Sequence, residues 1–103
     1  MTKTKFYTLC RCRNGIDVLL VNGYTDSVFH YYRGVEKWHA VHPATGLSVC
    51  TGKSRIAVAS VANSADMLSK INQVLDQRGS ELQRVFSEKV AAFEAAAAAK
   101  RGA

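Results

Sequence analysis

The feature that most constrains the fold is the stretch 38–54, which reads Trp-His-Ala-Val-His-Pro-Ala-Thr-Gly-Leu-Ser-Val-Cys-Thr-Gly-Lys-Ser. Its middle, 43–46, is dense in turn-forming residues and separates two strand-like segments, 37–42 and 47–51. A glycine then ends the second segment, and the hydroxyl of Ser54 can cap the first N–H groups of a helix. The stretch therefore predicts a β-hairpin that runs directly into a helix.

The residues before this hairpin predict more antiparallel sheet. Alternating side chains predict a first strand over 6–13, and an apolar run predicts a second over 16–21. The pair Asn14-Gly15 between them is typical of a two-residue hairpin turn, because both residues tolerate a positive φ. The four consecutive apolar residues that end the second segment predict a central strand that is at least partly covered on both faces.

A third strand is predicted over the aromatic-rich segment 28–33, with an extended loop as the alternative for this segment. The pair Asn22-Gly23 predicts a turn before it, and Gly34 predicts its end. The turns follow one another closely, which favours an antiparallel meander over crossover connections. The sheet half, 1–53, is thus expected to hold four or five antiparallel strands.

After Ser54 the spacing of apolar residues becomes helical. An apolar stripe recurs every three or four positions and predicts a packing helix over 54–78, long enough to lie across the sheet. Its members are Val61, Ala65, Leu68, Ile71 and Leu75.

Gly79 predicts the end of this helix, and 80–83 (Ser-Glu-Leu-Gln) predict a capping box that opens a second one. The second helix, 80–100, is expected to dock beside the first or to project as an arm. Its Ala-rich end has a high helix propensity and little to bury. The predicted class is therefore α+β, in a single domain over 1–103.

Charge is distributed unevenly along the chain. The net charge is +6, and the composition of 48% hydrophobic and 21% charged residues is that of a folded domain rather than a disordered chain. Residues 1–55 carry eight Lys or Arg against three acids, whereas 56–103 carry six against five. The sheet half is therefore the basic half, which indicates an anionic partner such as nucleic acid or an acidic protein surface, or else a solvated basic face.

Aromatic and cationic residues interleave in this half, a combination that stacks on bases and neutralises phosphates. The same residue types are enriched in protein–protein hot spots. Trp38 is expected in the core rather than at the contact. The predicted partner-binding or nucleic-acid-binding residues are Arg11, Arg13, Tyr31, Tyr32, Arg33, Lys37, His39, Lys53 and Arg55.

The segment 46–54 superficially resembles a phosphate-binding loop. It fails on spacing, because five residues separate Gly46 from Gly52 where that loop has four. What remains is the cation Lys53 beside a predicted helix N-terminus, where a phosphate is favoured. Simple capping of the helix is the alternative interpretation.

The cysteines and histidines do not have the spacing of a known metal or catalytic motif. Cys10 and Cys12 share a strand face, so a zinc site with Cys50, His39 or His42 is a remote alternative, although paired Cys-x-x-Cys knuckles are absent. Cys50 and His39 could face each other across the hairpin, but nothing orients the histidine. The sequence predicts no catalytic residue, no metal and no cofactor.

The pattern Trp38-x-x-Val41-x4-Gly46-Leu47-x-Val49-x-x-Gly52-x-Ser54, followed by an Ala-rich helix, resembles small accessory proteins of phages and mobile elements. Anti-CRISPR and other anti-defence inhibitors are examples of that class. The resemblance covers residues 38–70 and carries over no functional residue. It implies a non-enzymatic protein that docks stoichiometrically on a host complex.

The predicted function is therefore inhibition or modulation of a host nucleic-acid-processing or defence complex. A basic nucleic-acid-binding module that uses its sheet face is the alternative, and a small zinc- or thiol-dependent enzyme is a remote one. The predicted location is the cytoplasm, since no secretory signal and no membrane-spanning run is seen. A homodimer through the C-terminal helix is a further expectation.

Overall fold

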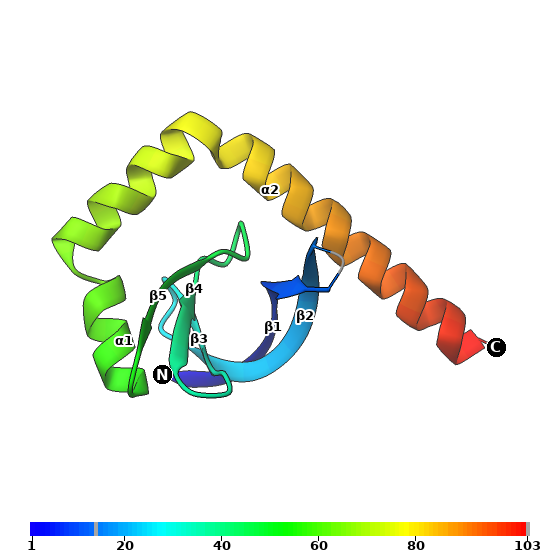
Figure 1. Cartoon of the computed structure of the whole chain (residues 1–103), viewed down its shortest axis with the longest axis horizontal. Coiled ribbons are helices and arrows are strands. Elements are labelled where there is room, and N and C mark those ends of the chain that lie inside the picture. The colour runs from blue at the N-terminus through cyan, green and yellow to red at the C-terminus, as the bar shows by residue number, and fades with distance from the viewer. Residues whose placement is uncertain (14, 103) are drawn as a thin grey trace.

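The structure is a computed structural model that describes residues 1–13 and 15–102. These residues form a five-stranded antiparallel sheet with its strands in sequence order, followed by a short and a very long helix (Figure 1). The predicted α+β class is confirmed. The elements are β1 (Thr2–Cys12), β2 (Gly15–Thr25), β3 (His30–Arg33), β4 (Trp38–Val41), β5 (Ser48–Gly52), α1 (Arg55–Ala62) and α2 (Ala65–Gly102).

The first two strands form a hairpin much longer than the rest of the sheet. They pair without a break from Thr2 opposite Thr25 to Cys12 opposite Gly15. Strand β3, in contrast, pairs with β2 only at Tyr24 and Thr25. The far half of the hairpin therefore extends beyond the other strands, as the curved blue and cyan ribbons show in Figure 1.

The predicted turn at Asn22-Gly23 was wrong, because both residues lie inside β2. Gly23 is instead needed for close packing: a Cβ there would collide with the carbonyl oxygen of Tyr31 and would lie 2.8 Å from the ring of Phe6. The predicted turn at Asn14-Gly15 includes Asn14, which lies outside the described residues. Gly15 itself opens β2 with a φ of 111°, a conformation that favours glycine.

Strand β2 lies between β1 and β3, as a central strand should, but the cover of its apolar run is incomplete on both faces, because Leu19 and Leu20 project from opposite faces. Val18 is buried, whereas Leu19 and Leu20 are 47% and 42% exposed. These residues belong to the part of β2 that has no pairing with β3. On the side where Val18 is buried, the hairpin meets α2, since the rings of Tyr7 and Phe93 lie 5.7 Å apart.

The main core lies between α1 and strands β3 to β5. Its buried members are Phe29, Tyr31, Ala40, Val58 and Ala62. The predicted cap at Ser54 is confirmed, because its Oγ accepts the backbone N–H of Ala57 at 3.1 Å.

The predicted helix over 54–78 is divided into two. Helix α1 ends at Ala62, and the chain turns at Asn63 and Ser64 before α2 begins. The Asn63 amide donates to the carbonyl of Ala59 at 2.9 Å, and the Oγ of Ser64 accepts the N–H of Met67 at 3.3 Å. These two polar side chains end one helix and begin the next, which overrides the continuous apolar stripe.

The predicted stop at Gly79 and the capping box at 80–83 were also wrong. Helix α2 continues through both as one ribbon that bends in its yellow stretch and runs past the β1–β2 hairpin (Figure 1). Phe86 is its one buried residue among those described. The Phe86 ring packs against Gly46, whose carbonyl accepts the N–H of Leu9 at 2.9 Å. The C-terminal part of α2 is thereby held to the sheet through the β4–β5 loop.

Asp26 joins the β2–β3 turn to the break between the helices. Its Oδ1 accepts the N–H groups of Val28 at 3.0 Å and Phe29 at 2.8 Å, and its Oδ2 accepts from the Tyr31 hydroxyl and from the Asn63 amide at 3.0 Å. Burial alone would raise the pKa of Asp26, but the four hydrogen bonds outweigh it and lower the pKa. The folded state therefore favours the carboxylate.

None of the described helices combines the length and the apolar character needed to cross a lipid bilayer.

Replacing Gly79 by alanine should stabilise the protein. A Cβ at this position would meet only side-chain atoms of Leu75, at 3.5 and 3.6 Å, which is ordinary contact. Because Gly79 lies inside a helix, we expect a gain of about 0.5–1 kcal/mol in the free energy of unfolding, measured by urea denaturation. Gly46→Ala is the matched control and should destabilise, since Gly46 has a φ of +68° and its Cβ would collide with Phe86. A loss of stability in Gly79→Ala would contradict a continuous α2.

Replacing Asp26 by asparagine should destabilise the protein by about 1–3 kcal/mol at neutral pH, because charge-assisted hydrogen bonds are lost. The pKa of Asp26 is lowered on folding, so its contribution is complete above the unfolded value of about 3.9 and is lost as the pH falls below it. Unfolding of both proteins measured from about pH 6 down to about pH 2 should show their difference shrinking. A difference independent of pH would show that the charge of Asp26 does not matter.

Candidate nucleic-acid interface

The predicted contact residues do not form one surface. Tyr31 is wrong as a contact residue: it is fully buried under α1. Burial, together with its hydrogen bond to Asp26, raises the pKa of Tyr31, so the hydroxyl stays protonated and donates to that carboxylate. Its role is therefore in the core.

Tyr32 and His39 lie on the opposite face of the sheet from Tyr31, because side chains alternate along a strand. Their rings stack at 4.9 Å with an angle of 10° between the planes, and both residues are half-buried. Burial, and secondly the charge of Lys37, lower the pKa of His39. The imidazole is therefore not a cation at neutral pH, and its partners are Tyr32 and the hydroxyl of Ser48 at 3.3 Å.

Arg11 and Arg13 are exposed at the far end of the β1–β2 hairpin. Arg11 is eight positions from Lys3 along β1, which corresponds to about 26 Å of strand. Lys37 is exposed in the β3–β4 connection. All three cations are accessible, but Arg11 and Arg13 are separated from the aromatic rings that the sequence grouped with them, whereas Lys37 is close enough for its charge to act on His39.

The structure brings another set of residues together, at the point where β2, β4 and the start of α1 meet. The Cζ of Arg55 lies 4.0 Å above the centre of the Tyr24 ring, which is a cation–π contact. The Tyr24 ring in turn lies 6.2 Å from that of Trp38, tilted by 43°. Trp38 also packs against the main core, so the prediction that it is a core residue is correct for part of its surface.

Strand pairing adds cations to these rings. Lys3 is the cross-strand partner of Tyr24, and Arg33 is that of Trp38. Directly opposite residues project from the same face of a sheet, so both cations share the face of the rings. Lys53 follows the glycine that pairs with Trp38.

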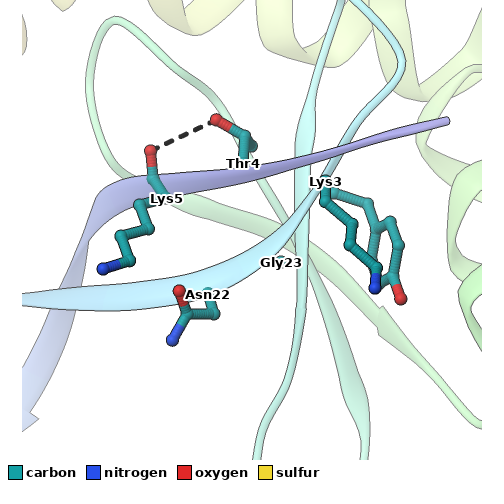
Figure 2. A pocket seen from close by; sticks show the side chains of 6 residues that line it. Lys3, Thr4, Lys5, Asn22 and Gly23 are labelled. Carbon is teal, nitrogen blue, oxygen red and sulfur yellow. Dashed lines mark hydrogen bonds between the residues drawn. The ribbon is translucent and has the colours of Figure 1, made fainter.

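Figure 2 shows Lys3 and Lys5 extending to one side of β1 and Thr4 to the other. With Asn22 and Tyr24 they line an open hollow of about 530 Å³. The whole surface is called the Tyr24 patch below. It consists of Lys3, Lys5, Asn22, Tyr24, Arg33, Trp38 and Arg55, to which Lys53 is added because it follows Gly52, the cross-strand partner of Trp38.

The cations of the Tyr24 patch have no acidic partner among residues 1–13 and 15–102. The ion pairs of that part of the chain lie within α2, between Arg78 and Glu81 and between Arg84 and Glu88. In the sheet half, Asp26 is engaged by its own hydrogen bonds, and Asp17 pairs with Cys10 at the other end of β2. Glu36 is exposed in the β3–β4 connection, between Arg33 and Trp38 in the sequence, and forms no ion pair with a described cation. The patch therefore carries an excess of positive charge around two partly exposed rings.

Four members of the patch were missed by the sequence analysis: Lys3, Lys5, Asn22 and Tyr24. The first strand was predicted to begin at residue 6, and Asn22 was assigned to a turn. The alternation of Lys3, Lys5, Tyr7 and Leu9 was a usable signal that the strand begins earlier. No comparable local signal places Tyr24 under Arg55, because that contact joins two distant segments.

The geometry gives little support to the two alternatives from the sequence, a zinc site and a reactive Cys50–His39 pair. Among the described residues, no group of three or more His, Cys, Asp or Glu side chains could hold a metal ion. Cys50 is paired with Ala40, so it projects from the face opposite to His39, and its thiol donates to the Val58 carbonyl at 3.7 Å. The suggested Cys50–His39 pair was therefore wrong.

No family model, no curated protein and no solved structure matches this chain. The resemblance to phage anti-defence proteins therefore stays a prediction.

Proposed function

We propose that the protein binds nucleic acid through the Tyr24 patch, with a preference for single strands. The observation that carries this proposal is a set of five cations around the Tyr24 and Trp38 rings that form no ion pair within residues 1–13 and 15–102. Phosphates would be neutralised by Lys3, Lys5, Arg33, Lys53 and Arg55, with the release of counterions.

The preference for single strands follows from the partly exposed rings. Tyr24 and Trp38 are both half-buried, so each leaves part of its ring accessible. Unpaired bases stack on aromatic rings and on guanidinium planes, whereas the bases of a duplex are already stacked on one another. The patch reads no particular sequence in this proposal, because stacking and phosphate contacts are tolerant of the base.

Reversing two charges in the patch should weaken binding strongly, whereas the same change at the hairpin tip should not. Lys3→Glu/Lys5→Glu removes two phosphate contacts, and Arg11→Glu/Arg13→Glu changes the net charge by the same amount in the same hairpin. We expect about a tenfold or greater loss for the first variant and a much smaller one for the second. Fluorescence anisotropy with a labelled single-stranded oligonucleotide measures both.

The salt dependence provides a second readout in this experiment. The slope of log affinity against log salt should fall by about 0.7 for each phosphate contact removed from a single strand. Equal losses in the two double variants would show that only net charge matters and would contradict a local site. No binding of the wild-type protein at low salt would remove the proposal.

A second candidate function is stoichiometric docking on a host nucleic-acid-processing or defence complex in the cytoplasm. It is favoured by the projecting end of the β1–β2 hairpin, which exposes Ile16 by 55%, Leu19 by 47% and Leu20 by 42%. Arg11 is the cross-strand partner of Ile16 and shares the face of Ile16 and Leu20, whereas Leu19 projects from the opposite face of the hairpin. Apolar side chains beside arginines are typical of protein interfaces.

Docking through the hairpin makes a prediction that nucleic-acid binding does not. Leu19→Thr/Leu20→Thr keeps the strand propensity but removes apolar contact area, and we expect about a tenfold loss of a protein complex recovered from nuclease-treated host lysate. Lys3→Glu/Lys5→Glu should leave that complex intact. Size-exclusion chromatography with light scattering measures its stoichiometry. Loss of the complex on nuclease treatment alone would contradict direct docking.

A further inference from the structure

The β1–β2 hairpin carries two cysteine thiols side by side. Cys10 and Cys12 project from the same face of β1, and their Sγ atoms are 3.4 Å apart. Neither is in a disulfide; Cys12 is exposed and Cys10 is partly exposed. Unbroken pairing with β2, Cys10 opposite Asp17 and Cys12 opposite Gly15, fixes the backbone that carries both thiols.

This geometry suits a bridge by one intervening atom better than a direct S–S bond. Two residues apart in a strand, the Cα atoms are separated by about 6.6 Å, near the upper limit of about 6.8 Å for disulfides. The sulfurs would also have to approach from 3.4 Å to about 2.05 Å. An atom that makes bonds of about 2.3 Å to sulfur spans the present separation with an angle of about 95°.

The pair supplies two sulfur ligands, and the cross-strand neighbour of Cys10, Asp17, does not complete a metal-binding group with them among the described residues. No third His, Cys, Asp or Glu joins them in a metal-binding group within the described part of the chain. An ion that needs four protein ligands is therefore poorly served. Two sulfur ligands suit a soft ion that has a low coordination number and bond angles near a right angle. Trivalent arsenic is of this kind.

Space for the remaining substituent lies beside Cys12. A hollow of about 280 Å³ is bounded there by Cys12, Ile16 and Asp17 of the hairpin and by Lys89 and Ala92 of α2. We propose that Cys10 and Cys12 form a dithiol site that captures a soft, low-coordinate ion of the trivalent arsenic type. This inference does not depend on the Tyr24 patch.

Capture of phenylarsine oxide is the reaction that tests the proposal. Each thiol forms one As–S bond, and the oxygen of the reagent leaves as water with the two thiol protons. No electrons are transferred, so neither an oxidant nor a reductant is needed.

In the reduced protein, we expect one arsenical per chain by intact mass and a fall in free thiols from three to one. The arsenical should resist removal by a monothiol about a hundredfold better than in Cys10→Ser or Cys12→Ser, because chelation gives the second thiol a high effective concentration. Cys50→Ser is the matched control and should capture the reagent like the wild type, with both remaining thiols consumed.

Two results would overturn the proposal. One is equal removal of the arsenical by a monothiol from wild type and Cys12→Ser, which would show attachment through single thiols. The other is one-to-one retention of Zn²⁺ alone as tight as that of the arsenical, which would show a site with more ligands than the two sulfurs.

Discussion

The buried side chain of Tyr31 connects the sheet to helix α1, through its ring and through its hydroxyl. The ring fills the core under α1, and the hydroxyl donates to Asp26, which also accepts from the Asn63 amide. Three segments are thus tied to one carboxylate: the turn after β2, the strand β3 and the end of α1. Because Asp26 carries its charge in a partly buried site, breaking any of these bonds leaves the others poorly compensated.

This arrangement also positions the Tyr24 patch. Tyr24 is the cross-strand partner of Tyr31, so the same pairing that buries Tyr31 under α1 places Tyr24 beside it on the same face. Helix α1 is anchored at one end by Asn63 and begins at the other end with Arg55, which lies over the Tyr24 ring. The contact that anchors one end of this eight-residue helix therefore helps to place Arg55, at its other end, over the half-buried Tyr24 ring.

Much of the fold could be predicted from local sequence signals. The errors arise where contacts between segments far apart in the sequence determine the local structure. Alternation and turn residues predicted an antiparallel sheet of four or five strands, where the structure has five, and Ser54 was sufficient for the helix cap. Gly79 looks like a helix end, but apolar residues continue on both sides of it, and Phe86 packs against Gly46. That packing outweighs the cost of about 1 kcal/mol for a glycine inside a helix.

The candidate site shows the same limit. Alternation along a strand predicts that Tyr31 and Tyr32 project from opposite faces of the sheet, but only the position of α1 determines which of the two is buried. Asn22 was assigned to a turn because its pairing with Lys5 depends on the register of a long hairpin.

The two halves of the chain differ in how their charges are paired. Helix α2 pairs its charges internally, between Arg78 and Glu81 and between Arg84 and Glu88, one turn apart. The sheet face has few acids for such pairing: Asp26 is committed to the core network, Asp17 lies at the other end of β2, and Glu36 lies in the β3–β4 connection without an ion pair to a described cation. The start of α1 adds the positive end of a helix dipole beside Arg55. The positive potential of the Tyr24 patch is therefore built from side chains and backbone together, and a bound anion would lower the electrostatic cost of holding these cations close to one another.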